Sequence, residues 1–152
     1  KANFYLAQSY FSDGQEVKAI PNYEYVIAQA RSEFTEQSLV RLSQVFLKTD
    51  DKQKAISVLS RLENEADFPQ NKTFAQANLM KLFYENKDYP NSVVYAEKVL
   101  NNSKTDDNVK SDAQIIIARA AIQTAFGLCQ IANYCPRRIG SRSFVLSGLF
   151  QK

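Results

Sequence analysis

A helix-pair pattern recurs in this chain about every 36 to 38 residues, and it constrains the fold more than any other feature. In each copy a small residue, or Met in the third copy, is followed at a fixed offset by an aromatic one. A period in this range is typical of stacked helical repeats. The sequence therefore predicts an all-α array that works by presenting a surface. The matching segments are 6–10, 42–46 and 79–83, followed by 19–23, 55–59 and 92–96.

Apolar residues at helical spacing predict seven helices joined by short turns, over 2–12, 15–32, 35–48, 52–65, 73–86, 90–101 and 108–124. Gly14 should close the first helix, because glycine tolerates a left-handed conformation. Thr35 should cap the third helix, and Pro90 suits the first position of the sixth. Pro21 should lie near the start of the second helix or kink its first turns. Residues 68–71 are expected to break the chain before the fifth helix.

Small residues on both helices of each pair should let the backbones approach closely, with aromatic residues filling the space between pairs. An ordinary amphipathic bundle would also have apolar stripes, but it would not repeat the same spacing before an aromatic residue in three copies, with a small residue in two of them and Met in the third. The expected small positions are Ala7, Ser43 and Ala118 on the first helices and Ala19, Ala55 and Ser92 on the second, with Tyr10, Phe46 and Phe83 as the aromatic residues. The other apolar members considered are Val17 and Ala30 of the second helix and Ile115, Ile116, Ile117, Ala121 and Ile122 of the last helix.

These residues resemble the tetratricopeptide repeat, a helix–turn–helix unit of about 34 residues. The resemblance covers about residues 2–124, as units 1–34, 35–70 and 71–105 and a partial unit 106–124. It implies a right-handed superhelical array of antiparallel helix pairs with about three and a half repeats. The matches are Leu6, Ala7, Tyr10, Ala19 and Tyr23; Leu39, Leu42, Ser43, Phe46 and Ala55, with Leu59 in place of an aromatic residue; Leu79, Phe83 and Ser92; and Ile117 with Ala118.

In this family the first helix of each pair lines a concave groove that binds a peptide or another protein. The resemblance implies the groove residues Tyr5, Gln8, Ser12, Arg41, Gln44, Lys48, Asn78, Lys81, Glu85, Arg119 and Gln123. The alternative for each of them is a solvated face without a ligand. Four basic residues against one acid indicate a mildly positive groove suited to an acidic or carboxylate-bearing segment.

One subclass of the family holds C-terminal carboxylates with paired Lys and Asn residues on its first two units. Here Phe4 and Gln8 stand at the first pair of these positions, and Arg41 replaces the second Asn. The clamp is therefore not reproduced, and binding of chaperone tails is not expected.

The residue types argue against catalysis, so we expect no enzyme and no cofactor. Histidine is absent, which removes the commonest general base and zinc ligand, and Cys129 and Cys135 do not match a zinc or redox motif. The paired acids at 50–51 and 106–107 stand where helices begin, where capping explains them. Three classes remain in order of preference: a protein-binding scaffold, a structural segment of a longer array that associates through open ends exposing Phe4 and Tyr5, and an enzyme.

The last 28 residues, 125–152, depart from the repeat and form an atypical basic tail. Residues 137–152 carry four basic residues and no acid, and the rest of the chain holds 15 basic and 16 acidic residues. A repeat region this close to neutral does not favour nucleic-acid binding, and membrane contact has little support. Two hypotheses are open for the tail: a cap made by Phe144, Val145, Leu146, Leu149 and Phe150, or a segment read out of frame.

The chain starts inside a helical pattern without an initiating Met, which indicates a piece of a longer protein. Residues 1–10 lack the apolar centre of a signal peptide, and no run of about 18 apolar residues suits a membrane span. The loose consensus, rich in Lys, Asn, Gln and Tyr, is similar to that of bacterial arrays in cell-envelope proteins. The compartments considered are therefore the bacterial envelope or periplasm and the cytoplasm.

Overall fold

Seven helices and no strands make up the described part of the chain, residues 1–131 of a computed structural model with side chains through residue 125. The all-α prediction is confirmed. The helices are α1 (Ala2–Ser12), α2 (Glu16–Ala28), α3 (Thr35–Lys48), α4 (Lys52–Glu65), α5 (Pro69–Glu85), α6 (Tyr89–Asn101) and α7 (Asp107–Ile131). The proposed tail roles fall almost wholly on residues 132–152, outside the described residues.

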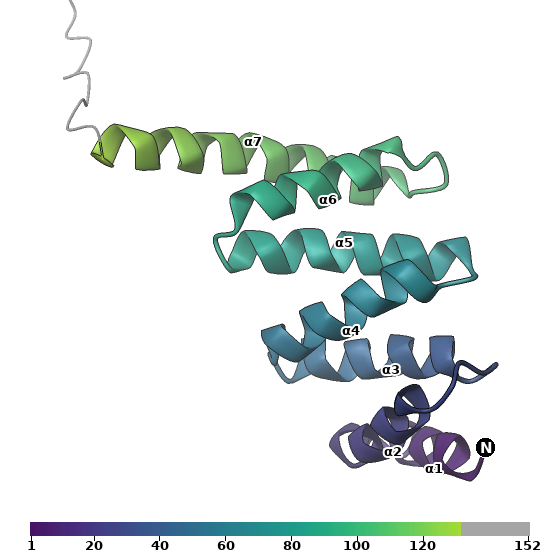
Figure 1. Cartoon of the computed structure of the whole chain (residues 1–152). Coiled ribbons are helices and arrows are strands. Elements are labelled where there is room, and N and C mark those ends of the chain that lie inside the picture. Colours follow the sequence, from purple (N-terminus) through teal and green to yellow (C-terminus); the bar gives the residue numbers. More distant parts are fainter. Residues whose placement is uncertain (132–152) are drawn as a thin grey trace, which may run out of the picture.

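The helices are stacked in chain order (Figure 1). Each helix packs against the next, and α5 also packs against α7. In Figure 1, α3, α5 and α7 run across the stack in one direction, while α4 and α6 return at a tilt. None of the described helices is long and apolar enough to cross a membrane.

The three turns within the helix pairs have the same backbone geometry. Gly14, Asp50 and Lys87 each have a positive φ, of 72°, 56° and 62°. In each turn the next residue donates its N–H to the carbonyl of an aromatic residue five positions earlier: Gln15 to Tyr10, Asp51 to Phe46 and Asp88 to Phe83, at 2.9–3.0 Å. This is the bonding of a helix end closed by a left-handed residue. The repeated units therefore share the hydrogen bonds of their turns as well as their sequence pattern.

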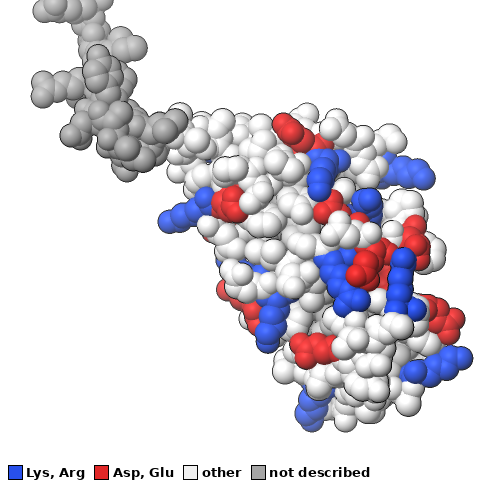
Figure 2. All heavy atoms as spheres, in the orientation of Figure 1, with Lys and Arg blue, Asp and Glu red and all other residues white. Residues whose placement is uncertain are grey.

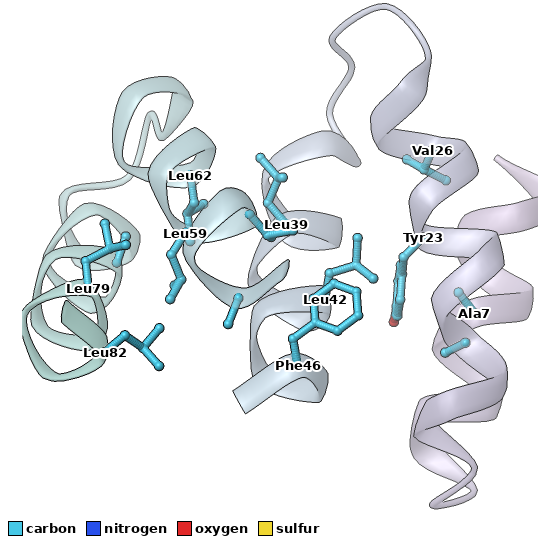
Figure 3. Packing of buried hydrophobic residues seen from close by; sticks show 14 of the residues in the cluster. Ala7, Tyr23, Val26, Leu39, Leu42, Phe46, Leu59, Leu62, Leu79 and Leu82 are labelled. Atoms are coloured by element: carbon cyan, nitrogen blue, oxygen red, sulfur yellow. The ribbon is translucent and has the colours of Figure 1, made fainter. Parts of the chain in front are cut away.

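The predicted small positions lie in the core, except for Ala118. Ala7, Ser43, Ala19, Ala55 and Ser92 have no exposed surface. The two serines remain satisfied, because Ser43 Oγ donates to the Val40 carbonyl at 2.7 Å and Ser92 Oγ to that of Met80 at 3.1 Å. Figure 3 shows Leu42 and Phe46 of α3 pointing towards Tyr23 of α2, with Leu59 and Leu62 of α4 on the side of Leu79 and Leu82 of α5.

Ser38 provides a test of buried polarity in this core. Its side-chain oxygen is buried and has no hydrogen-bond partner in the described part of the chain, whereas the equally buried Ser43 has one. We expect Ser38→Ala to raise the free energy of unfolding by about 1 kcal/mol, because it removes a hydroxyl that lost its water on folding. Urea denaturation followed by circular dichroism measures this. Ser43→Ala is the matched control and should be neutral or destabilising, so equal effects of the two changes would refute the argument.

Helix α2 ends four residues earlier than predicted, at Ala28, and Ala30 is exposed. Two hydrogen bonds hold the chain at this end, one of them across 34 residues. Arg61 donates to the carbonyl of Ile27 at 2.8 Å, and the N–H of Ser32 donates to Thr35 Oγ1 at 2.9 Å. The expected role of Thr35 is therefore wrong, since its hydroxyl accepts from the preceding loop instead of capping α3.

Other local predictions need correction as well. Helix α5 begins at Pro69, inside the expected breaker, because proline fits the first helical position. Pro90 is in the first turn of α6, but the helix begins one residue earlier, at Tyr89. Val17, expected inward, is exposed, and Phe4, expected at an exposed end, is buried.

The burial pattern of α7 is displaced by one residue from the predicted register. Ala113, Ile116 and Ala120 are buried, while Ala118, assigned to a small core position, is exposed. Ile116 follows Leu79 by 37 residues, and Leu79 follows Leu42 by the same interval, so Ile116 is the equivalent position. The predicted register places Ile117 at this position because a small residue, Ala118, follows it.

The displaced register leaves apolar side chains of α7 at the surface. Ile115 is 48% exposed and Ile122 64%, and Ala121 is also exposed. The helix itself continues past Thr124 to Ile131, so the break in sequence pattern is not the end of the helix.

Candidate functional site

Arg41 of α3 is held in place by side chains of α1 and α3. Its guanidinium carbon lies 4.5 Å from the centre of the Phe11 ring, and Nη1 donates to Gln44 Oε1 at 3.1 Å. Gln8 of α1 belongs to the same cluster, because its Oε1 accepts from the buried Tyr23 hydroxyl at 3.1 Å. Burial raises the pKa of Tyr23, and the charge of Arg41 partly opposes this rise.

This cluster borders a cavity of about 560 Å³ at the N-terminal ends of α3 and α5. Gln37, Val40 and Arg41 line it from α3. Phe68, which is 64% exposed, and Asn71 line it where α5 begins. The cavity thus has polar donors on one side and apolar surface beside them. Among the predicted site residues, only Arg41 lines this cavity.

A second cavity, of about 340 Å³, lies between α5 and α7. Three predicted site residues line it, namely Lys81, Glu85 and Arg119. Its apolar lining comes from Tyr84, Ile115 and Ile116, of which Ile115 is exposed. With the register of α7 corrected, Ile115, Ala118 and Ile122 are the equivalents of Arg41, Gln44 and Lys48.

The remaining predicted site residues do not converge on either cavity. Tyr5 packs edge-on against Phe34, with ring centres 5.9 Å apart. Ser12 donates to the Gln8 carbonyl and Asn78 to that of Phe74, so both bond within their own helices. Gln123 is exposed on α7.

Ion pairs remove part of the positive charge expected along this surface. Lys48 pairs with Glu16 at 2.7 Å, and Lys81 pairs with Asp112 at 2.9 Å. The predicted acid, Glu85, pairs with Lys52 at 2.9 Å. Figure 2 shows the same mixing of basic and acidic side chains over the described part of one face. Arg41 and Arg119 are the candidate basic residues with no carboxylate within 4.0 Å among the described residues.

Sequence reasoning missed the aromatic and acidic residues that complete these cavities. Phe68 was hidden in the expected breaker, although the rule applied to Pro90 would have placed Pro69 at a helix start as well. Glu36, in the first turn of α3, is the acidic residue. Its carboxylate accepts from the N–H groups of Asp67 and Phe68 at 3.0 and 3.2 Å and from Asn71 Nδ2 at 2.7 Å. A contact across 31 to 35 residues has no local sequence signal.

A separate polar cluster joins α4, α5 and α6 around Glu63. The carboxylate is buried and accepts from Lys98 Nζ at 2.8 Å and from Gln76 Nε2 at 3.1 Å. The Lys98 Nζ also lies 4.4 Å from the centre of the Tyr95 ring. Each polar group of this cluster has a partner within it, and the contacts join side chains of α4, α5 and α6.

No group of three His, Cys, Asp or Glu side chains within the described residues lies close enough together to hold a metal ion. No protein-family model, curated protein or solved structure matches the chain.

Proposed function

We propose that the chain is a non-catalytic scaffold of the tetratricopeptide type that binds a peptide or protein segment across α3, α5 and α7. One observation carries this proposal. The two cavities that contain predicted site residues lie along these three helices, and each combines exposed apolar surface with an arginine that has no carboxylate within 4.0 Å among the described residues. Recognition sites for protein segments combine apolar contact area with a few placed polar groups in this way.

Selection of peptides from a displayed random library tests the proposal. We expect the selected peptides to perturb amide resonances of α3, α5 and α7 more than those of α2 and α4. The double change Arg41→Ala and Lys81→Ala should weaken their binding at least about tenfold, since it removes the Arg41 guanidinium from one cavity and leaves Asp112 without its cation in the other. Titrations monitored by nuclear magnetic resonance give both the map and the affinity.

A matched control removes two positive charges elsewhere, with Lys18→Ala on α2 and Lys104→Ala in the loop before α7. Binding that is weakened equally by both double variants would reflect net charge alone. Selected peptides that bind the Arg41 and Lys81 variant with unchanged affinity, or that perturb only α2 and α4, would reject this surface.

The second candidate is a structural segment that associates through its end faces. Leu6 is 46% exposed, whereas its repeat equivalents Leu42 and Leu79 are fully buried by neighbouring helices, and Ile122 is exposed at the other end. Size-exclusion chromatography with light scattering separates the two candidates. A monomer at every concentration would remove the second one.

A further inference from the structure

We propose that the cavity beside Arg41 is a subsite for a peptide carboxylate that has a large apolar side chain close to it. The inference rests on the proposed scaffold function and names the chemistry of the segment bound there. The carboxylate belongs on Arg41 and Gln37, and the apolar group belongs on Val40 and Phe68. All four residues line the same cavity.

The guanidinium is held in a fixed position before any ligand arrives. Phe11 covers one face of it at 4.5 Å, and Gln44 accepts from Nη1. These contacts occupy one face of the Arg41 guanidinium and one of its nitrogens, so other N–H donors of the planar group remain available. A fixed guanidinium loses little side-chain freedom on binding and can meet both oxygens of a carboxylate. Gln37 stands one helical turn before Arg41, where its amide can donate to the same ligand.

The acidic residues around the cavity already have partners. Asp67 pairs with Arg31 at 2.7 Å, and Glu33 lies 4.0 Å from Lys1 Nζ. The Glu36 carboxylate is occupied by its three N–H donors at the start of α5. The lining as a whole carries three acids and two arginines, so the anion site depends on Arg41 itself, whose guanidinium has no carboxylate within 4.0 Å among the described residues.

The apolar half of the subsite lies beside the polar half. Val40 precedes Arg41 on α3, and the exposed Phe68 ring lines the same cavity from the α4–α5 connection. An exposed aromatic ring next to a cavity provides contact area at little cost in side-chain entropy. A lone inorganic anion would leave this area unused, so the better ligand is a peptide carboxylate beside a large apolar side chain.

Four pentapeptides with a common Gly-Ser-Gly leader test the subsite. The first ends in Leu-Phe with a free carboxylate, and the second is its C-terminal amide. The third is an amide with Glu before the Phe, and the fourth is the same amide with Lys. We expect the first, the third or both to bind at least about tenfold more tightly than the second and fourth. The comparison of the first with the third tells a chain terminus from an acidic side chain.

Variants of the full chain locate the effect. Arg41→Gln should abolish the preference for carboxylates, and Arg41→Lys should keep part of it, because an ammonium group is a point charge without the planar fork. Phe68→Ala, at an exposed position that leaves the fold intact, should weaken all four peptides about threefold. Lys18→Gln is the matched control, because it removes one positive charge from α2, away from both cavities, and it should have no effect.

Equal affinity for acid and amide peptides would overturn the inference, and so would equal binding of the Lys peptide. No perturbation of Gln37, Arg41 or Phe68 by millimolar acid peptide would overturn it as well. A failure of the carboxylate subsite can be distinguished from a failure of the scaffold proposal. Selected peptides that perturb α3 and α5 but bind Arg41→Gln unchanged would remove the carboxylate subsite and leave the scaffold in place.

Discussion

Replacing Leu42 with Ala is expected to lower the free energy of unfolding by about 3 kcal/mol, the largest effect of any single change considered. The side chain is fully buried and belongs to the core that joins α1 to α5. Truncation removes apolar contacts and leaves a cavity that the neighbouring helices cannot fill. Urea denaturation followed by circular dichroism measures the loss from the shift in midpoint.

The repeat supplies a control that is matched in chemistry and in sequence position. Leu6 occupies the same place in the first unit, but 46% of its surface is exposed because no helix covers that side in the described chain. We expect Leu6→Ala to cost about 1 kcal/mol or less, while Leu79→Ala should cost as much as Leu42→Ala. Similar losses at Leu6 and Leu42 would show that burial by a neighbouring unit does not determine the stability of this position.

The bounds of three helices could be predicted from the sequence alone. Helices α1, α3 and α4 have the predicted bounds, because each combines a regular apolar spacing with a polar turn that closes it. Periodicity and turn chemistry are both local, so sequence alone reveals them. The start of α5 was missed only because Pro69 was interpreted as a breaker.

The register of α7 illustrates a limit of pattern matching. Three consecutive isoleucines, residues 115–117, leave the apolar spacing ambiguous by one position. The preceding helices decide between them, since only α5 and α6 pack on α7 among the described helices. The predicted register followed the small Ala118, but burial follows Ala113, Ile116 and Ala120.

The candidate site could be predicted only in part, for a related reason. Repeat geometry selected Arg41, Lys81 and Arg119, which all line cavities. It could not reveal that Lys81 is paired with Asp112 or that Phe11 holds Arg41, because these contacts join different helices. A charged side chain that looks unpaired in the sequence is often in contact with a residue of a neighbouring helix.

Glu63 gives the second large prediction, a pH-dependent loss of stability. Burial by itself would raise the pKa of this carboxyl group, but hydrogen bonds from Lys98 and Gln76, together with the Lys98 charge, outweigh burial and lower the pKa below 4.5. The hydrogen bond from Lys98 to Glu63 in turn raises the pKa of the lysine above 10.5. Both groups are therefore charged in the folded protein at neutral pH.

The directions of these shifts set the pH window. A lowered carboxyl pKa stabilises the fold above the unfolded value and loses that contribution as the pH falls through the folded one. A raised lysine pKa stabilises the fold below about 10.5 and loses its contribution as the pH rises further. We expect Glu63→Gln to lower the free energy of unfolding by about 2 kcal/mol at pH 7, since it replaces charged hydrogen bonds with neutral ones.

The difference between the wild type and Glu63→Gln should shrink as the pH falls from about 5 and nearly vanish once Glu63 is protonated in both states. Denaturation curves at pH 7, 5 and 3 measure it. Glu97→Gln is the control, because this exposed residue on α6 has no ion pair among the described residues, and its effect should be small at every pH. A Glu63→Gln loss that stays constant down to pH 3 would mean that the amide disturbs packing, and it would refute a charged Glu63 as the link between α4 and α6.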